Sequence, residues 1–559
     1  MGRTLGPTGV LAAAMATVVA LIGGIAAADE ITLGDDGLFR VSGKPFLPVM
    51  ALNQPTDTWA DLAALGVNTF VAESRPTPQT TVKQYLEAAE KLKVYVVLPP
   101  AWIEQDGAEA AAAVAASQRV LAIGYGGRPD RMHAESEARV EAAEARVDPE
   151  RPLGLLFDDD PNTWTILEPV RGFALTVRVS ESAMRRRGPD LEPPVVTRVA
   201  VMQRDAAGFL SQPRTVQILD DGRELVTIEL KNADGVLQKF DLPKPTAVRS
   251  LTAKVLAVHE GRDPRGAWSE LQLLAADGTN VLASPVRYVS EGEADAVAAE
   301  CLKLRGQWKR PVLVTTTPAF ARLPLVGDMP HSPGRAYYQR ALSECDAAMT
   351  TLLPLDSGGR PVTLDAALLQ QLTDLGARPK CLGVWMAAGL PHPERAVGGA
   401  RAASPMELRA NVLLSLVNGA RMVPYVTQRL TAGNTAAVDI PEGNRAEMKR
   451  LAAVLPRLAE ILAMPAGEGP SWDIAMGQPA AVFPPRWQMV RRGPDGSRYL
   501  WVVNPTSRTA EATLDLAGGS IAERLFDDAT VPVASDGRTA RVTLPPWYAE
   551  VCRVARSGQ

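Results

Sequence analysis

Short apolar runs alternate with amphipathic stretches in two separate parts of the chain. The runs have the length of strands, and the stretches between them place apolar residues three or four positions apart, as at Leu86, Ala89 and Leu92. This alternation is typical of parallel strands joined by helices. Eight runs are candidate strands, at residues 46–52, 67–72, 94–98, 120–125, 311–317, 347–353, 381–387 and 420–425. Eight strand–helix units predict an α/β fold, a closed (β/α)8 TIM barrel.

Two stretches between these runs carry helix signals of different kinds. Ser404 followed by Glu407 is a capping-box pattern, which predicts the start of a helix. Residues 134–147 alternate Glu and Arg around small apolar residues, and we predict a helix there, after the fourth strand.

The periodicity changes after residue 150. From there to residue 286, polar and apolar positions alternate in runs such as VVTRVAVMQ and LVTIELK. The alternation indicates antiparallel strands and predicts an all-β sandwich that interrupts the barrel after strand 4. A second alternating region, with YLWVVNPTSRTAEATLDL, follows residue 465. We therefore predict barrel halves at 29–150 and 287–465, the inserted sandwich at 151–286 and a C-terminal β-sandwich at 466–559.

The first 28 residues have the features of a signal peptide. Arg3 precedes an uncharged run that reaches Ala28, and the run ends in three alanines before Asp29. Cleavage after Ala28 would make the protein secreted or periplasmic and leave it without a membrane span. The alternative is a retained N-terminal anchor, since about 20 apolar residues can cross a bilayer.

Composition and charge exclude several function classes. The 559 residues are 46% hydrophobic and 22% charged, as in an ordinary globular protein of several domains, and the net charge is -4. No basic run indicates nucleic-acid binding. The four histidines are scattered and show no metal-ligand spacing. Neither a Gly-x-Ser-x-Gly elbow nor a phosphate-binding loop occurs. We expect no organic cofactor. The four cysteines allow either one or two disulfides or buried free thiols.

Several runs resemble glycoside-hydrolase barrels when taken in order. VSGKPFLPVMALNQPTDTWADLAALGVNTF resembles their opening, VLAIGYGGRPD their fourth strand, and SPMELRANVLLSLVNGARMVPY their seventh helix and eighth strand. The resemblance implies a polysaccharide or glycan as partner and, if the chain is active, hydrolysis of O-glycosidic bonds.

The chain departs from that family at the two places where hydrolysis is carried out. Active relatives have a carboxylic acid at the ends of strands four and seven. Here Arg128 stands before Pro129, and no acid follows the seventh strand until Glu394. We therefore expect the usual glutamate pair to be lost or relocated.

Relocation requires other acids at the same face of the barrel. Glu73 follows the second strand and Asp130 the fourth, so these two form the candidate catalytic pair. The alternative is that Glu73 makes a structural ion pair with Arg75 or Arg128.

Aromatic side chains at the same face are candidates for stacking on sugars. Trp102 follows the third strand, Tyr125 ends the fourth and Trp385 lies in the seventh. With Arg128 they form the predicted substrate-binding set. Packing in the core or at its rim is the alternative for these rings.

The predicted inserted sandwich has its own resemblance. LLFDDDPNTWTILEP at residues 155–169 and GAWSELQLL at 266–274 resemble discoidin-type, galactose-binding-like domains. That likeness implies a structural Ca²⁺ ion held at the following four positions: Asp158, Asp160, Thr163 and Glu270. Hard oxygen ligands suit Ca²⁺. A solvated acidic loop is the alternative.

Two functions follow from these observations. The first is an exported carbohydrate-recognising protein on a glycoside-hydrolase-like scaffold that lacks the usual strand-four and strand-seven pair. The second is an active glycoside hydrolase of polysaccharides that uses a relocated pair. If the N-terminal segment is retained, a cell-surface interaction module is a third. The sequence gives no indication of oligomeric state.

Overall fold

A computed structural model describes most of the chain between Glu30 and Arg556. The residues left out of that range are 74, 76–78, 137, 144–145, 148–150, 180–191, 205–209, 262, 318–332, 351–380, 390–402, 428–437, 476–486, 527–533 and 536–538. The predicted signal peptide and its cleavage site lie outside the described residues. Among the helices that the structure describes, none has the length and apolar character needed to cross a bilayer.

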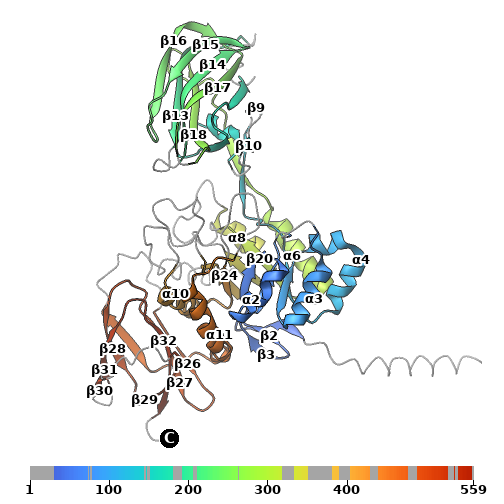
Figure 1. Cartoon of the computed structure of the whole chain (residues 1–559), viewed down its shortest axis with the longest axis vertical. Coiled ribbons are helices and arrows are strands. Elements are labelled where there is room, and N and C mark those ends of the chain that lie inside the picture. The colour runs from blue at the N-terminus through green and yellow to red at the C-terminus, as the bar shows by residue number, and fades with distance from the viewer. Residues whose placement is uncertain are drawn as a thin grey trace, which may run out of the picture.

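The central sheet is parallel and forms a nearly closed eight-stranded barrel (Figure 1). In barrel order its strands are β4 (Val49–Leu52), β5 (Thr69–Val71), β6 (Tyr95–Leu98), β7 (Val120–Gly124), β20 (Val312–Thr316), β21 (Ala347–Thr350), β22 (Cys381–Val384) with β23 (Met386–Ala387), and β24 (Val423–Val426). The seventh strand is split at Trp385, so that β22 pairs with β21 and β23 pairs with β24. Pairing of β24 with β4 closes the other side.

Helices surround this barrel. They are α2 (Trp59–Ala64, after the short 3-10 helix η1, Thr56–Thr58), α3 (Val82–Leu92), α4 (Pro100–Ala116), α6 (Ala294–Trp308), α8 (Arg335–Ala341), α10 (Pro405–Val417) and α11 (Glu442–Ala463). Ser404 caps α10, with its side chain on the Glu407 amide and the Glu407 side chain on the Ser404 amide, which confirms the predicted capping box. Thr81 and Gln84 cap α3 in the same way.

A small antiparallel sheet contributes to the barrel interior. It consists of β1 (Ile31–Leu33), β2 (Phe39–Val41) and β3 (Lys44–Phe46). Ile31 and Phe39 share a buried cluster with Met50 and Leu121 of the barrel strands. This apolar packing fixes the barrel wall from which the loops at the carboxyl ends of the strands project.

Between β7 and α6 the chain forms a sandwich of two five-stranded antiparallel sheets. One sheet contains β10 (Arg146–Val147), β11 (Thr165–Glu168), β18 (Gly266–Leu274), β13 (Val195–Arg204) and β16 (Leu237–Ala247). The other contains β15 (Arg223–Glu229), β14 (Gln212–Asp220), β17 (Ser250–His259), β12 (Ala174–Arg178) and β9 (Val140–Ala143). The 3-10 helix η2 (Leu153–Phe157), Phe173 and Trp268 fill the core between the sheets.

A two-stranded ribbon joins this sandwich to the barrel (Figure 1). It pairs β8 (Met132–Ser136) with β19 (Val286–Ser290). The helix predicted at 134–147 is therefore wrong, because this segment forms the strands β8, β9 and β10. Their pairing partners β19, β12 and β11 lie later in the chain, so tertiary pairing overrides the local helix signal.

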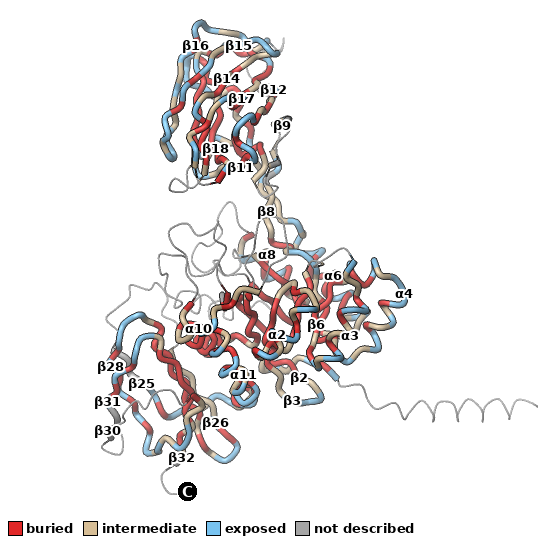
Figure 2. Tube along the Cα trace, viewed as in Figure 1, coloured by how far each residue is buried: buried red, intermediate tan, exposed pale blue. Residues whose placement is uncertain are grey.

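The chain after α11 forms a second, smaller sandwich. Its sheets are β25 (Ser471–Ala475), β28 (Ala510–Asp515), β31 (Thr539–Leu544) and β30 (Ala534–Ser535), and β26 (Gln488–Arg492), β27 (Arg498–Val503), β32 (Ala549–Arg556) and β29 (Gly519–Arg524). Trp501 and Val551 share one buried cluster with α10, which is therefore buried on nearly all sides (Figure 2).

An ion pair lies inside the packing of α10. Arg409 is 2% exposed and makes two hydrogen bonds to Glu447 of α11, at 2.6 and 2.9 Å. The Arg409 guanidinium also lies 4.8 Å from the ring centre of Phe526, in the C-terminal sandwich. This pair connects two barrel helices to that sandwich.

Candidate functional site

The loops after β5 and β7 bring a carboxylate and a guanidinium together at the barrel mouth. Glu73 lies two residues after β5, and Arg128 lies in the loop after β7. The Arg128 Nη2 and Glu73 Oε2 atoms are 3.8 Å apart, and both side chains are partly buried. The backbone amide of Glu73 donates to Asn53 Oδ1, just after β4. The ion pair between Glu73 and Arg128, one of the alternatives drawn from sequence, is thus present.

Arg75, the other cation considered for Glu73, has a different carboxylate partner. Its Nη2 atom lies 2.7 Å from Asp106 Oδ1, and Asp106 also accepts from the Val82 amide at the start of α3. These contacts join the loop after β5 to α4. One oxygen of Glu73, Oε1, is buried and has no hydrogen-bond partner among the residues that the structure describes.

Asp130 occupies a closed hydrogen-bonded position. It is 1% exposed and accepts from the Thr317 amide at 2.9 Å, from the Thr317 hydroxyl at 2.8 Å and from the Tyr338 hydroxyl at 2.8 Å. Burial raises the pKa of Asp130, and the hydrogen bonds from Thr317 and Tyr338 oppose that rise. Asp130 therefore connects the loop after β7 to β20 and α8. Its carboxylate faces these neutral donors, whereas Glu73 faces Arg128.

The predicted stacking residues are mostly buried. Trp102 lies in α4, is 5% exposed and packs edge-on against Tyr85 at 5.3 Å, with the Arg75 guanidinium 5.0 Å from its ring. Trp385 is 4% exposed and belongs to the barrel-interior cluster. Tyr125 is half-buried, and burial raises the pKa of its hydroxyl. Burial of both tryptophans favours packing for their rings rather than contact with a sugar.

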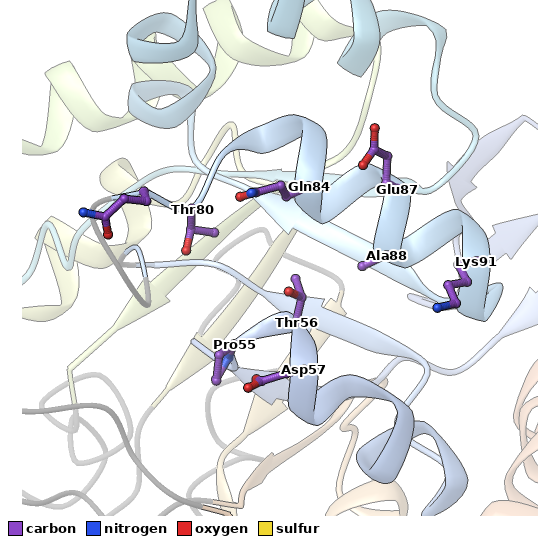
Figure 3. A pocket seen from close by; sticks show the side chains of 9 residues that line it. Pro55, Thr56, Asp57, Thr80, Gln84, Glu87, Ala88 and Lys91 are labelled. Atoms are coloured by element: carbon purple, nitrogen blue, oxygen red, sulfur yellow. The ribbon is translucent and has the colours of Figure 1, made fainter.

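A polar groove lies beside the barrel mouth, between η1 and α3 (Figure 3). Its volume is about 530 Å³. Thr56 and Asp57 lie on one side of the groove, and Thr80, Gln84 and Lys91 lie on the other. Sequence reasoning missed this groove because its two walls come from different strand–helix units.

Three of the four predicted cation ligands are hydrogen-bonded to one another in the acidic loop of the first sandwich. Asp158 accepts from the Asp160 amide at 3.0 Å and from the Thr163 hydroxyl at 2.9 Å. Glu270, on β18, is 1% exposed and accepts from Gln272 Nε2 at 3.3 Å. Its other oxygen, Oε1, is buried and has no hydrogen-bond partner within the described part of the chain.

Burial and neighbouring negative charges raise pKa values at this loop. Burial, followed by the negative charge of Asp158, raises the pKa of Glu270 to about 8. Burial also raises the pKa of Asp158, to which the charge of Asp160 adds. The same two aspartates add to the effect of burial at Tyr288, on β19, and its pKa is about 12. Like charges therefore accumulate around a buried carboxyl.

These features fit a hard cation. A buried carboxylate oxygen without a partner and several nearby like charges are what a bound cation would stabilise. Within the described ranges, however, no three His, Cys, Asp or Glu side chains converge as a complete metal cluster. Since Ca²⁺ takes six to eight oxygen ligands, backbone carbonyls or water would have to complete its coordination.

Trp164, next to this loop, carries a partly exposed aromatic ring that sequence reasoning did not single out. The Arg151 guanidinium lies 4.1 Å from its ring centre, and the ring is half-buried. The available signal was its position directly after Thr163, at the end of the acidic loop.

Comparisons with known proteins assign no family. No protein-family model matches the chain, and no curated protein matches it either. A family 32 carbohydrate-binding module from a family 31 glycoside hydrolase of Clostridium perfringens is 13% identical over 24% of this chain and 93% of its own, with a TM-score of 0.19. A family 32 module of the same organism, solved with galactose, is 13% identical over 25% of this chain and 98% of its own, with a TM-score of 0.19. An Anoxybacillus alpha-amylase is 11% identical over 48% of this chain and 58% of its own, with a TM-score of 0.30. TM-scores this low do not establish a relationship.

Proposed function

We propose that this protein is an exported carbohydrate-recognising protein on a glycoside-hydrolase-like barrel, and that it binds glycans without hydrolysing them. In this proposal the first sandwich is an insertion after the fourth barrel strand. The observation that carries the non-hydrolytic part is the ion pair between Arg128 and Glu73. A guanidinium stands where the resembled enzymes have a carboxylic acid.

The chemistry of hydrolysis explains why this pair matters. One carboxylic acid must protonate the glycosidic oxygen while a second carboxylate attacks or activates water. A guanidinium is not deprotonated in proteins, so Arg128 cannot take the first role. Asp130 already accepts hydrogen bonds from Thr317 and Tyr338. These contacts support structural roles for the described carboxylates at the barrel mouth.

Retention on insoluble polysaccharides tests the recognition part. The full chain should bind at least one polysaccharide class and elute with the matching soluble sugar. Glu73→Gln should be retained equally well, because the proposal gives Glu73 no contact with the sugar. Absence of retention on every polysaccharide of a broad panel would overturn the proposal.

The polar groove between η1 and α3 is a candidate surface for this binding. Hydroxyl, amide, carboxylate and ammonium groups line it, and these can donate to and accept from sugar hydroxyls. Replacing Thr56 and Lys91 together with alanine should weaken retention several-fold. Lys83→Ala is the matched control, because Lys83 is exposed on the same helix but does not line the groove.

An active hydrolase with a relocated acid pair is the second candidate. The observation in its favour is the buried Glu73 Oε1, which has no hydrogen-bond partner in the described ranges. Release of reducing ends that is lost in Glu73→Gln would establish this candidate. Glu109→Gln, at an exposed position of α4 outside the groove, is the control and should leave any release unchanged.

We also propose that the acidic loop binds a structural Ca²⁺ ion through Asp158, Asp160, Thr163 and Glu270. Adding Ca²⁺ to chelator-treated protein should raise the melting temperature of the first sandwich by several degrees, because a ligand of the folded state stabilises it. Glu270→Gln should lose this response, whereas Glu141→Gln, exposed on β9, should keep it. A Ca²⁺ response that persists in Glu270→Gln would contradict the assignment.

Export is tested by the N-terminus of the mature protein. Cleavage of the signal peptide predicts a secreted or periplasmic chain that begins at Asp29. An intact N-terminus in a membrane fraction would instead support the anchored alternative.

A further inference from the structure

Two buried cysteines from different elements of the barrel lie against one another. Cys301 is in α6, and Cys345 lies between α8 and β21. Their Sγ atoms are 3.0 Å apart, and both residues are 0% exposed. The other two cysteines are placed differently, with Cys381 in β22 and Cys552 in β32.

We propose that Cys301 and Cys345 form a structural disulfide in the mature protein. A disulfide bond is about 2.05 Å long, so the two sulfurs need to approach by only about 1 Å. Small rotations of the two side chains supply such a movement. The bond would join α6, the helix before β20, to the residues just before β21, the strand after β20.

The chemistry needs an external oxidant. The two thiols lose two protons and two electrons, and a disulfide-containing oxidant accepts them and becomes two thiols. One cysteine thiolate attacks the oxidant to form a mixed disulfide, and the second cysteine displaces the remaining thiol. Because both sulfurs are buried in the folded chain, we place this exchange during folding. Compartments outside the reducing cytosol favour it, so in the cell the inference rests on the proposed export.

The position of the bond determines its effect. It would close a loop of about 44 residues, and cross-links stabilise chiefly by restricting the unfolded chain. We expect reduction to lower the melting temperature of the barrel by about 5–10 °C. The Cys301→Ala/Cys345→Ala double variant should not respond to reductant. The matched Cys381→Ala/Cys552→Ala variant should respond as the wild type does.

The test is cysteine mapping of the full chain after refolding in a glutathione redox buffer, which makes the result independent of export. Denaturation and alkylation without reductant should label only Cys381 and Cys552, and a digest should contain one peptide pair linked through Cys301 and Cys345. After reduction, all four cysteines should be labelled. Labelling of all four without reduction, or a link between any other pair, would overturn the proposal. A protein that forms the bond in this buffer but is not exported would refute the proposed localisation alone.

Discussion

The carboxylates at the barrel mouth and those at the acidic loop of the first sandwich have different interaction partners. Asp130 accepts three hydrogen bonds from neutral donors, and Glu73 lies near Arg128. Glu270 has one unpartnered oxygen within the described residues and is surrounded by negative charge. The barrel carboxylates thus hold loops together, whereas we propose that the sandwich carboxylates bind a positively charged ligand.

The largest effect is expected at the Arg409–Glu447 pair, where a cation compensates a deeply buried carboxylate. Arg409→Met leaves Glu447 buried, with Arg450 3.8 Å away. We expect a loss of about 3–5 kcal/mol in the free energy of unfolding, measured with a chemical denaturant. The Arg409→Met/Glu447→Met double variant should lose less than the single variant. A larger loss in the double variant would mean that the pair is not compensated as described.

A smaller but clear effect is expected at Asp130. Asp130→Ala leaves the Thr317 amide and the Thr317 and Tyr338 hydroxyls without their acceptor, at a cost of about 2–3 kcal/mol in denaturant unfolding. Asp130→Asn keeps one acceptor oxygen and should cost less. Unchanged stability in Asp130→Ala, together with lost glycan hydrolysis, would make Asp130 catalytic instead of structural.

The third effect is the pH dependence of stability in the sandwich without Ca²⁺. Folded Glu270 keeps its proton up to about pH 8, whereas the unfolded group loses it near 4.5, so the folded state binds more protons between these values. Stability should therefore fall as pH rises from 4.5 to 8, which a falling melting temperature measures.

Glu270→Gln separates this slope from other contributions. Glu550 of the C-terminal sandwich also has a pKa raised by burial, to about 7, and adds a fall of the same sign below that pH. The Glu270→Gln variant should lose the Glu270 part of the fall in chelator-containing buffer and retain the parts due to Glu550 and to other buried carboxyl groups. An equal fall of stability with pH in the wild type and in Glu270→Gln would show that the pKa of Glu270 is not raised in the folded state.

The smallest effect is expected at the Glu73–Arg128 pair. Both side chains are partly exposed and their closest atoms are 3.8 Å apart, so the coupling should be below about 1 kcal/mol. A double-mutant cycle with Glu73→Gln and Arg128→Met measures it. A coupling of several kcal/mol would require a tighter pair than the structure contains.

Much of the fold could be predicted from local sequence pattern. The wrong predictions concern segments whose structure depends on pairing with strands distant in sequence. Each of the eight predicted runs overlaps a barrel strand, because buried parallel strands are continuously apolar. The split of the seventh strand at Trp385 depends on its two neighbours and has no local signal. The prediction of a helix at 134–147 was wrong for the same reason. The alternation of charged residues is compatible with a helix or with strands, and pairing with β19 and β12 selects the strands.

In the candidate sites, too, some neighbours were predictable from local pattern and others depend on residues distant in sequence. Glu73 and Arg128 were predictable as neighbours, because carboxyl ends of parallel strands meet at one face. The partners of Asp130 lie 187 and 208 residues away in sequence, and no motif connects them to it. Trp102 follows the third strand and Trp385 lies within the seventh, as expected, but only the packed structure reveals that both rings are buried.

Calorimetric titration of the chelator-treated full chain with Ca²⁺ tests the contrast between the two regions most directly. The account predicts binding of one ion with release of protons at pH 7, because Glu270 must ionise to bind it. Glu270→Gln should abolish this binding, and Glu73→Gln should leave it unchanged. Binding that survives in Glu270→Gln but is lost in Glu73→Gln would place the ion at the barrel mouth and contradict the account.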